Sequence, residues 1–192
     1  LFSASLVAEV LPQVWQRNPE EAQQGLEELR HLTKSALAEM RTMLLELRPQ
    51  AVLETSLNDL LLQLTEAITS RAELVISFET EPIPALPPDV HVTFYRVGQE
   101  ALHNVVKYAE ASHLSVSLRA SPPLEGQRAS AWQGQVILHI SDDGSGFDPG
   151  DTVQGQLGLG IMRDRAEDVG AMLSIESSPG HGTKITLVWR ST

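Results

Sequence analysis

Residues 135–147 read QVILHISDDGSGF, and this stretch decides much of the fold. Apolar residues alternate with their neighbours along it, which predicts a half-buried β-strand over 135–141. Asp142 follows the strand directly, with Gly144 and Gly146 close behind. A carboxylate at a strand end can accept a hydrogen bond from an exocyclic amine such as that of adenine, and glycines let a flat ring approach the backbone. On its own, the stretch is more typical of an Asp-Gly turn.

Upstream, a helix predicted from about Asp89 to Glu110 carries Glu100, Asn104 and Lys107. Spacings of four and three residues place these polar side chains on one helix face. A carboxylate and an amide oxygen one turn apart can hold Mg²⁺, directly or through its waters, and a lysine can meet a phosphate as a point charge. Taken alone, the trio is also typical of a solvated helix face.

Downstream, residues 155–160 read GQLGLG and lead into a helix that ends near Val169. Glycines that open a helix expose N–H groups and the positive end of the helix dipole, which suit phosphate. A loop rather than a strand precedes them, so this is not a dinucleotide-binding fingerprint. The chain closes with a predicted hairpin over 172–189, in which Thr183 opens the last strand. A simple hairpin turn is the alternative there.

The remaining patterns complete one domain. An amphipathic helix begins at Ser56, with Asp59 completing its cap. Two further strands are predicted over 74–78 and 114–118. We therefore predict an α+β fold in which a helical hairpin precedes an α/β sandwich.

The N-terminal part predicts an arm of two helices. The first ends near Trp15, and Asn18 caps a second that runs to about Leu47 along a heptad seam. Such a thin hairpin cannot bury its own apolar stripe, so we predict a four-helix bundle formed by two chains. A hairpin packed on the following domain of the same chain is the alternative. The predicted boundaries are 1–49 for the arm and 50–192 for the second domain.

Composition excludes several classes of function. The formal net charge is −11, with 14 basic residues against 25 acidic ones, so a broad nucleic-acid surface is not expected. Cysteine is absent, which excludes disulfides, zinc-thiolate sites and cysteine nucleophiles and is compatible with a reducing cytosol. No apolar run reaches the roughly 20 residues of a membrane span, so no direct membrane contact is expected. Because the first residue is not methionine, we expect a piece of a longer protein.

Four motifs in order carry a resemblance to a known superfamily. QEALHNVVKYA, DDGSGF, GLGIMRDRA and PGHGTKITL look like the N, G1, G2 and terminal Gly-Thr boxes of GHKL ATPases. Within that superfamily, the sequence most resembles sensor histidine kinases that pair with NarL-type response regulators. ALAEMRTMLLELRP, at 36–49, resembles the second helix of their dimerisation domain. The resemblance implies a GHKL-type sandwich whose mixed sheet packs on helices.

The resemblance also implies a site for ATP and Mg²⁺. Asp142 would read adenine, Asn104 would hold the metal with Glu100 nearby, and residues 148–157 would form a lid. Glu100 is also the candidate catalytic residue, because it stands where hydrolysing members of the superfamily have their water-activating carboxylate. The full set of expected nucleotide-binding residues is Asn104, Lys107, Tyr108, Asp142, Gly144, Gly146, Gly158, Leu159, Gly160 and Thr183.

The implied activity is transfer of the γ-phosphoryl of Mg-ATP to a histidine and then to an aspartate on a response-regulator receiver domain. The implied setting is a cytoplasmic homodimer joined through 1–49, in a parent that can be membrane-anchored. The resemblance places the phosphoacceptor histidine just before LFSASLVAEV at 1–10, so it is expected upstream of Leu1. The sequence around His31 does not match it. Tyr108 stands where the family usually has histidine, which leaves open a degenerate module that only dimerises and docks a partner. A GHKL ATPase or a serine kinase of the anti-sigma type is a third possibility.

Overall fold

The computed structural model describes residues 11, 12, 14, 15, 17–19, 21–27, 29, 30, 33, 49–69, 74–121, 134–148 and 156–191. Its elements are α3 (Pro49–Glu54), α4 (Leu57–Thr69), β1 (Val75–Thr80), α5 (Pro88–Asn104), the π-helical turn η1 (Val105–Ala109), β2 (His113–Ser121), β3 (Gln135–Asp142), α6 (Gln156–Asp168), β4 (Met172–Ser177) and β5 (Thr183–Arg190).

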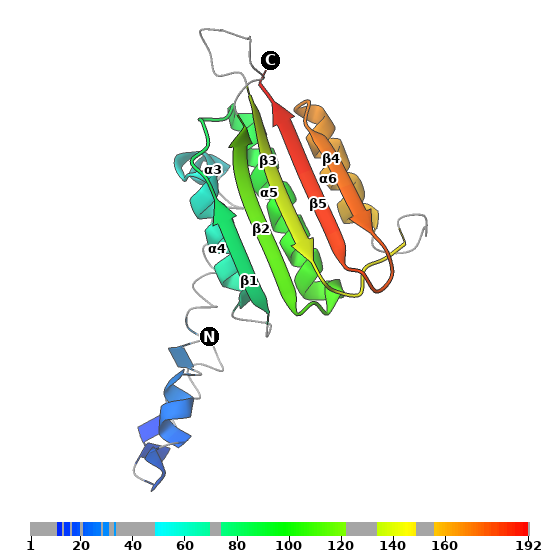
Figure 1. The fold of residues 1–192 in the computed structure, drawn as a ribbon. Helices are drawn as coiled ribbons and strands as arrows, with labels where there is room; N and C mark the ends of the chain where they lie inside the picture. The colour runs from blue at the N-terminus through cyan, green and yellow to red at the C-terminus, as the bar shows by residue number, and fades with distance from the viewer. Residues whose placement is uncertain are drawn as a thin grey trace.

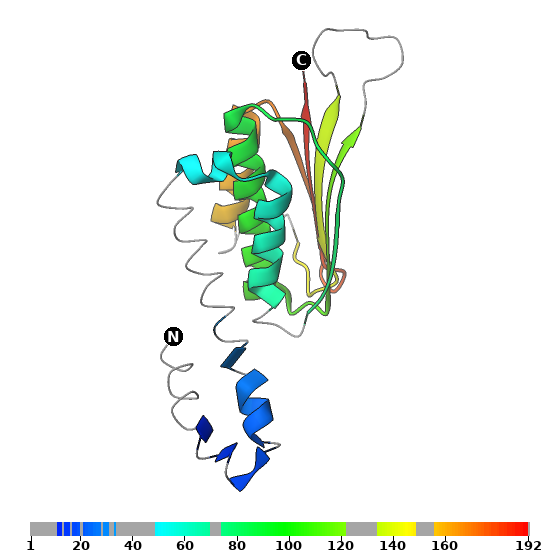
Figure 2. The same ribbon diagram turned by 90° about the vertical axis from the view of Figure 1, so that its left-hand side faces the viewer.

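The five strands form one mixed sheet in the order β1-β2-β3-β5-β4 (Figure 1). β1 and β2 are parallel, because α5 crosses over between them, and the other neighbours are antiparallel. Figure 2 shows two layers, with α4, α5 and α6 on one face of the sheet. No helix of the described ranges covers the other face. The predicted α+β sandwich with a mixed sheet is confirmed.

The core lies between these two layers, and α5 is its centre. This helix contacts α3, α4 and α6 as well as β3 and β5. The alternation seen in the sequence turns one side of each central strand toward the helices. The side chains that are at most 1 % exposed in this layer include Leu60, Leu61, Phe94, Tyr95, Val97, Ala101, Leu102, Leu114, Val116, Leu118, Val136, Leu138 and Leu187.

The predicted helix caps at Ser56 and Asn18 are confirmed. The backbone N–H of Asp59 donates to the Ser56 hydroxyl oxygen at 3.1 Å, and that hydroxyl donates to the Asp59 carboxylate at 2.6 Å. The backbone N–H of Glu21 donates to the side-chain oxygen of Asn18 at 3.3 Å. Most of the heptad seam lies outside the described residues, so the predicted bundle of two chains stays a prediction.

The structure differs from the sequence-based expectation at three helix ends. α3 was not expected, because Pro49 was predicted to end the preceding helix. Proline is equally suited to the first position of a helix, and Pro49 begins α3. Val52 of α3 is buried in the core. The predicted helix over 89–110 changes to π geometry at Val105. α6 begins at Gln156, so Gly158 lies inside the helix rather than before it, and the expected lid overlaps its first two residues.

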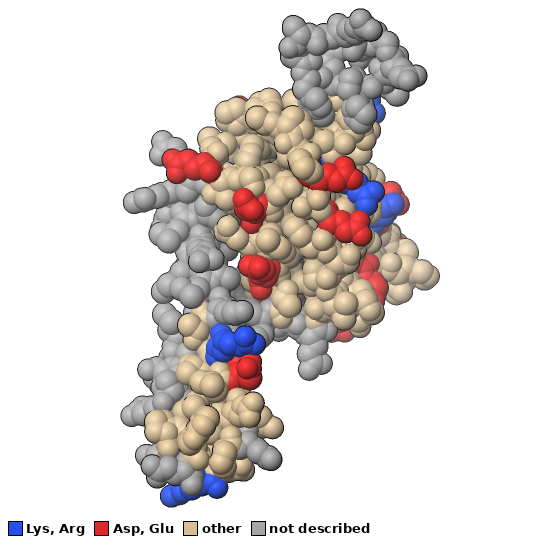
Figure 3. All heavy atoms as spheres, turned by 60° about the vertical axis from the view of Figure 1, so that its left-hand side comes forward, with Lys and Arg blue, Asp and Glu red and all other residues tan. Residues whose placement is uncertain are grey.

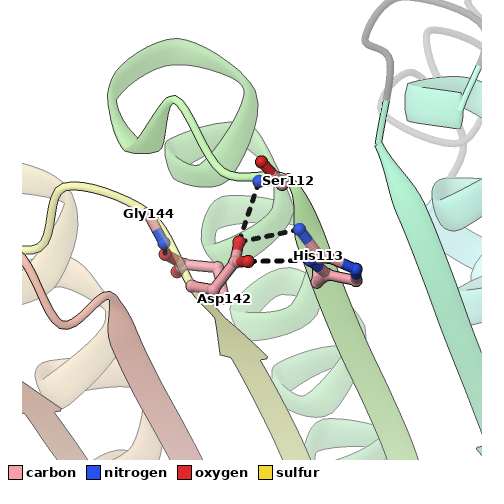
Figure 4. Close-up of polar contacts among 5 residues, drawn as sticks. Ser112, His113, Asp142 and Gly144 are labelled. Carbon is pink, nitrogen blue, oxygen red and sulfur yellow. Dashed lines mark hydrogen bonds and ion pairs between the residues drawn. The ribbon is translucent and has the colours of Figure 1, made fainter.

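Asp143 braces one end of the sheet, and Figure 4 shows its partners Ser112 and His113 at the start of β2. One carboxylate oxygen accepts hydrogen bonds from the backbone N–H groups of Ser112 and His113, at 2.8 and 2.7 Å. The other lies 2.8 Å from Nδ1 of His113. The backbone and then the side chain of His113 are the main causes that lower the pKa of Asp143 from 3.8 to about 2. The brace ties the loop after β3 to the first residue of β2.

The described surface carries little concentrated positive charge. On the face in Figure 3, acidic side chains are spread over the α/β unit, and the described Lys and Arg side chains gather into no continuous stripe. None of the helices in the described ranges combines the length and the apolar character that crossing a membrane requires.

The brace predicts a pH-dependent contribution to stability. The folded-state pKa of Asp143 lies below its unfolded value, so its contribution is complete above about pH 4 and is lost as the pH falls toward 2. We expect Asp143→Asn to unfold at lower urea concentration than wild type at pH 7, with the gap closing between pH 4 and pH 2. Asp164→Asn, at an exposed position of α6, is the control and should follow wild type throughout. A gap that persists unchanged at pH 2 would contradict the charged brace.

The core predicts a sharp difference between two adjacent leucines of α4. Leu61 is fully buried, whereas Leu62 is 39 % exposed. We expect Leu61→Ala to lower the free energy of unfolding by about 2–5 kcal/mol, because it leaves a cavity, and Leu62→Ala to lower it by much less. Urea denaturation of both variants measures the difference, and equal losses would contradict the packing described.

Candidate functional site

A row of three polar side chains crosses the end of the sheet. Asp142 ends β3, Thr183 begins β5 opposite it, and Ser177 ends β4 opposite Thr183. Cross-strand partners project to the same side of a sheet, with Cβ atoms about 4.5–5.5 Å apart. The row therefore faces the helix layer at the end of the sheet where η1 lies (Figure 1).

Asp142 is a buried carboxylate with backbone donors. Its side chain is 8 % exposed and accepts a hydrogen bond from the backbone N–H of Gly144 at 2.9 Å. The backbone N–H of Thr183 also donates to it. Desolvation by burial is the largest influence and raises the pKa of Asp142, while these two donors oppose the rise. A buried carboxylate with spare lone pairs favours a ligand that brings further hydrogen-bond donors.

The loop after Asp142 is held from two sides. Toward η1, the Ser145 backbone N–H donates to the Ala109 carbonyl at 2.6 Å, and the Ser145 hydroxyl donates to the Tyr108 carbonyl at 3.1 Å. Toward the β4–β5 turn, the Ser145 carbonyl accepts from the Gly180 N–H at 2.6 Å. A Cβ on Gly144 would overlap the Ala109 carbonyl oxygen, so this close approach requires glycine.

Gly146 lies in the same loop and has a φ of 58°, in the left-handed region that favours glycine. The structure thus brings together the four predicted base-side residues Asp142, Gly144, Gly146 and Thr183, and the backbone carbonyl of Tyr108 is tied to the same loop through Ser145.

The π-helical turn changes how Lys107 and Tyr108 are presented. A π turn contains more residues than an α turn, so Lys107 no longer follows Asn104 at the ideal α-helical angle. Both Lys107 and Tyr108 are exposed, and the Lys107 ammonium lies 5.0 Å from the centre of the Tyr108 ring. The expected single polar face of Glu100, Asn104 and Lys107 is therefore divided: the first two belong to α5 and the third to η1.

The predicted phosphate end is formed by α5 and the start of α6. Glu100 and Asn104 are both half-buried and lie one turn apart on α5. A Cβ on Gly158 would overlap a carboxylate oxygen of Glu100, so this carboxylate rests against the first turns of α6. A helix N-terminus favours negative charge, which here comes from the Glu100 side chain.

The other two residues expected at the phosphate end differ in burial. Gly160 has open space where a Cβ would be. The Leu159 side chain is 9 % exposed and belongs to the core, so a ligand could meet residue 159 only through its backbone.

The oxygen donors of Glu100 and Asn104 fit Mg²⁺ chemically. This ion takes oxygen ligands and keeps several waters, so one or two protein donors beside phosphates are enough. The described residues contain no group of three or more His, Cys, Asp or Glu side chains that could hold a metal by themselves. A metal at this position would therefore depend on a phosphate-bearing ligand.

Three contributors to the site were missed by sequence reasoning. Asp143, the second acid of the doublet, braces the loop, and His113 receives that brace at the start of β2. Ser177 contacts Phe147, Gly182 and Thr183 from the end of β4. The alternating pattern of β4 places Ser177 on the same side as Leu173 and Ile175, which was the one available signal.

Comparison with known proteins identifies the relatives of this arrangement. Residues 89–192 match the family described as "Histidine kinase-, DNA gyrase B-, and HSP90-like ATPase", and residues 1–52 match the one described as "Histidine kinase". The sensor histidine kinase YhcY of Bacillus subtilis is 35 % identical, over 97 % of this chain and 45 % of its own length. An uncharacterized sensor-like histidine kinase of Chloroflexus aurantiacus is 32 % identical, over 95 % of this chain and 30 % of its own length.

Solved structures support the same fold. The histidine kinase domain of the blue-light activated histidine kinase EL346 from Erythrobacter litoralis superposes with a TM-score of 0.52 at 19 % identity, over 98 % of this chain and 94 % of that one. ShkA, solved in complex with AMPPNP, gives a TM-score of 0.55 at 18 % identity, over 90 % of this chain and 37 % of that one.

The family matches together extend over both parts of the sequence, and the larger one includes all four motif segments. The chain spans less than half the length of the curated relatives it matches. The predicted resemblance to sensor histidine kinases is confirmed, and the chain belongs to the family of histidine kinase-, DNA gyrase B- and HSP90-like ATPases.

Proposed function

We propose that residues 50–192 bind Mg-ATP and that the whole protein is a sensor histidine kinase. The buried carboxylate of Asp142, beside Thr183 at the end of the sheet, carries this proposal. Its two backbone donors leave lone pairs, which the exocyclic amine of adenine would satisfy. Gly144 and Gly146 of the loop after Asp142 would border the base, and Tyr108 would lie toward the phosphates.

At the other end of the site, Asn104 would coordinate Mg²⁺, with Glu100 nearby and Lys107 free to reach a phosphate from η1. The backbone of residues 158–160 would hold phosphate oxygens at the start of α6. Bound phosphates would repel the Glu100 carboxylate, which already lies beside Gly158. A magnesium ion held by Asn104, with Glu100 nearby, would supply positive charge that offsets this repulsion.

The proposed reaction passes the γ-phosphoryl of ATP to a histidine of the whole protein and then to an aspartate of a response-regulator receiver domain. Positioning and charge stabilisation carry most of such a transfer. We propose residues 1–49 as the dimerisation arm, and the family match over 1–52 supports this assignment. Two relatives that match over nearly the whole of this chain are named as sensor or sensor-like histidine kinases.

Replacing Asp142 tests the adenine assignment. Asn retains one acceptor oxygen but turns an N–H₂ group toward the base, so we expect Asp142→Asn to weaken ATP binding at least about tenfold, or roughly 1.4 kcal/mol. Burial raises the pKa of Asp142, so its charge costs folding free energy at neutral pH. The nucleotide-free variant should therefore have an unchanged or higher Tm. Calorimetric titration and thermal melts measure the two effects, and equal ATP affinity in both proteins would defeat the assignment.

Replacing Asn104 tests the metal assignment. We expect wild type to bind ATP more tightly with Mg²⁺ than with EDTA. In Mg²⁺, Asn104→Ala should bind ATP about tenfold more weakly than wild type. Affinity in EDTA should be nearly the same for both proteins. His103→Ala, at the exposed neighbouring position, is the matched control and should keep the full Mg²⁺ effect. An Asn104→Ala protein that also keeps it would remove Asn104 from the metal site.

A further inference from the structure

We propose that Ser177 determines the base specificity of the site by fixing the direction of the Thr183 hydroxyl. The inference rests on the proposed function, because it concerns how the same site distinguishes purine bases. Ser177 would not touch the nucleotide; it is a positioning residue that acts through Thr183.

The hydrogen bonds of Ser177 assign every proton in the group. Its hydroxyl oxygen lies 2.9 Å from the Gly182 carbonyl oxygen, and a carbonyl can only accept, so the single proton of Ser177 goes there. The backbone N–H of Phe147 donates to the same hydroxyl oxygen at 2.9 Å. The third neighbour is the Thr183 hydroxyl, at 3.0 Å. With its only proton used, Ser177 can only accept from Thr183.

This assignment leaves Thr183 as an acceptor toward any ligand. The one proton of its hydroxyl points at Ser177, so the free side of the oxygen presents lone pairs. Asp142, the cross-strand partner of Thr183, also presents lone pairs. Two acceptors in one row favour a base edge that carries an amine.

The two purine classes differ at this edge. A 6-aminopurine such as adenine offers N–H donors from its exocyclic amine. A 6-oxopurine places a carbonyl oxygen there, facing lone pairs with no donor between them, and an unpaired buried acceptor costs about 1–3 kcal/mol. If Thr183 could rotate, its hydroxyl could donate to that carbonyl oxygen and relieve part of the cost. Ser177 therefore contributes to discrimination by preventing this rotation.

The place of Ser177 in the fold suits this role. It is half-buried at the last position of β4, and its contacts join the DDGSGF loop, the β4–β5 turn and the first residue of β5. Ser174, on the same strand, is exposed and points to the opposite face of the sheet. Ser174 is therefore a matched control for substitutions of Ser177 within the same strand.

The test compares ATP with inosine triphosphate, which carries an oxygen in place of the amine. The Kd of each nucleotide is measured with Mg²⁺ by calorimetric titration of the 192-residue chain, together with the Tm. Discrimination is expressed as the Kd of inosine triphosphate divided by the Kd of ATP. We expect Ser177→Ala to reduce this ratio by about tenfold. Ser177→Thr keeps the hydroxyl and should retain the wild-type ratio, as should Ser174→Ala.

A second variant keeps the test decisive if Ser177→Ala folds poorly. Thr183→Val is close in shape and removes the hydroxyl itself, so it should also lower the ratio. The double variant should lower it no further than Thr183→Val alone, because the two residues act as one unit. Additive losses in the double variant would overturn the assignment.

The remaining outcomes separate this inference from the proposed function. Equal weakening of both nucleotides by Ser177→Ala would show a purely structural role and overturn the inference while leaving ATP binding intact. Failure of the unmodified chain to bind ATP would overturn the proposed function and this inference with it. A wild-type ratio near one would overturn the inference alone.

Discussion

A carboxylate buried at the end of a central strand is the constraint on which this site depends. Asp142 has almost no access to water, so its hydrogen bonds must come from the protein or from a ligand. The protein supplies backbone N–H groups from Gly144 and Thr183. To deliver the first, the chain must turn immediately after β3, and this turn brings Gly144 against the carbonyl of Ala109. The conformation of the loop therefore follows from the need to satisfy one side chain.

The loop is kept in this conformation by neighbours that do not belong to the row around Asp142. Asp143 ties it to the start of β2, and Ser145 ties it to η1 and to the β4–β5 turn. Ser177 adds a link from β4 to Phe147. Most of these bonds involve backbone groups, which are well placed once the sheet has formed. The sheet thus helps to hold the loop in the conformation that satisfies the Asp142 carboxylate.

The proposed phosphate end follows a different physical logic. Glu100 brings negative charge to the start of α6, where the helix dipole is positive, and Lys107 lies apart from it on the π-helical turn. The negative charge of Glu100 therefore lies on α5 and the positive charge of Lys107 on η1. The two elements follow each other in the chain, but these side chains do not lie on one helix face. A ligand that carries both phosphates and a divalent ion is complementary to such a distribution. The two ends of the proposed site are connected by Asn104 and the single π turn that follows it.

The sequence by itself determined the class of fold, most element positions and the family, because these depend on local periodicity, caps and short motifs in a fixed order. It also singled out Asp142, Thr183 and the glycines, whose chemistry is visible in the residue type. Only the tertiary structure decided which of these residues meet. Strand order and register place Asp142 beside Thr183, which is distant in the sequence, and add Ser177, which no sequence pattern singled out. The π turn, the start of α6 before Gly158 and the brace at Asp143 were equally beyond local patterns. The brace joins Asp143 to the backbone of Ser112 and His113, η1 is bonded to Ser145, and the first turns of α6 lie against Glu100. The identity of a residue does not specify which distant groups will surround it.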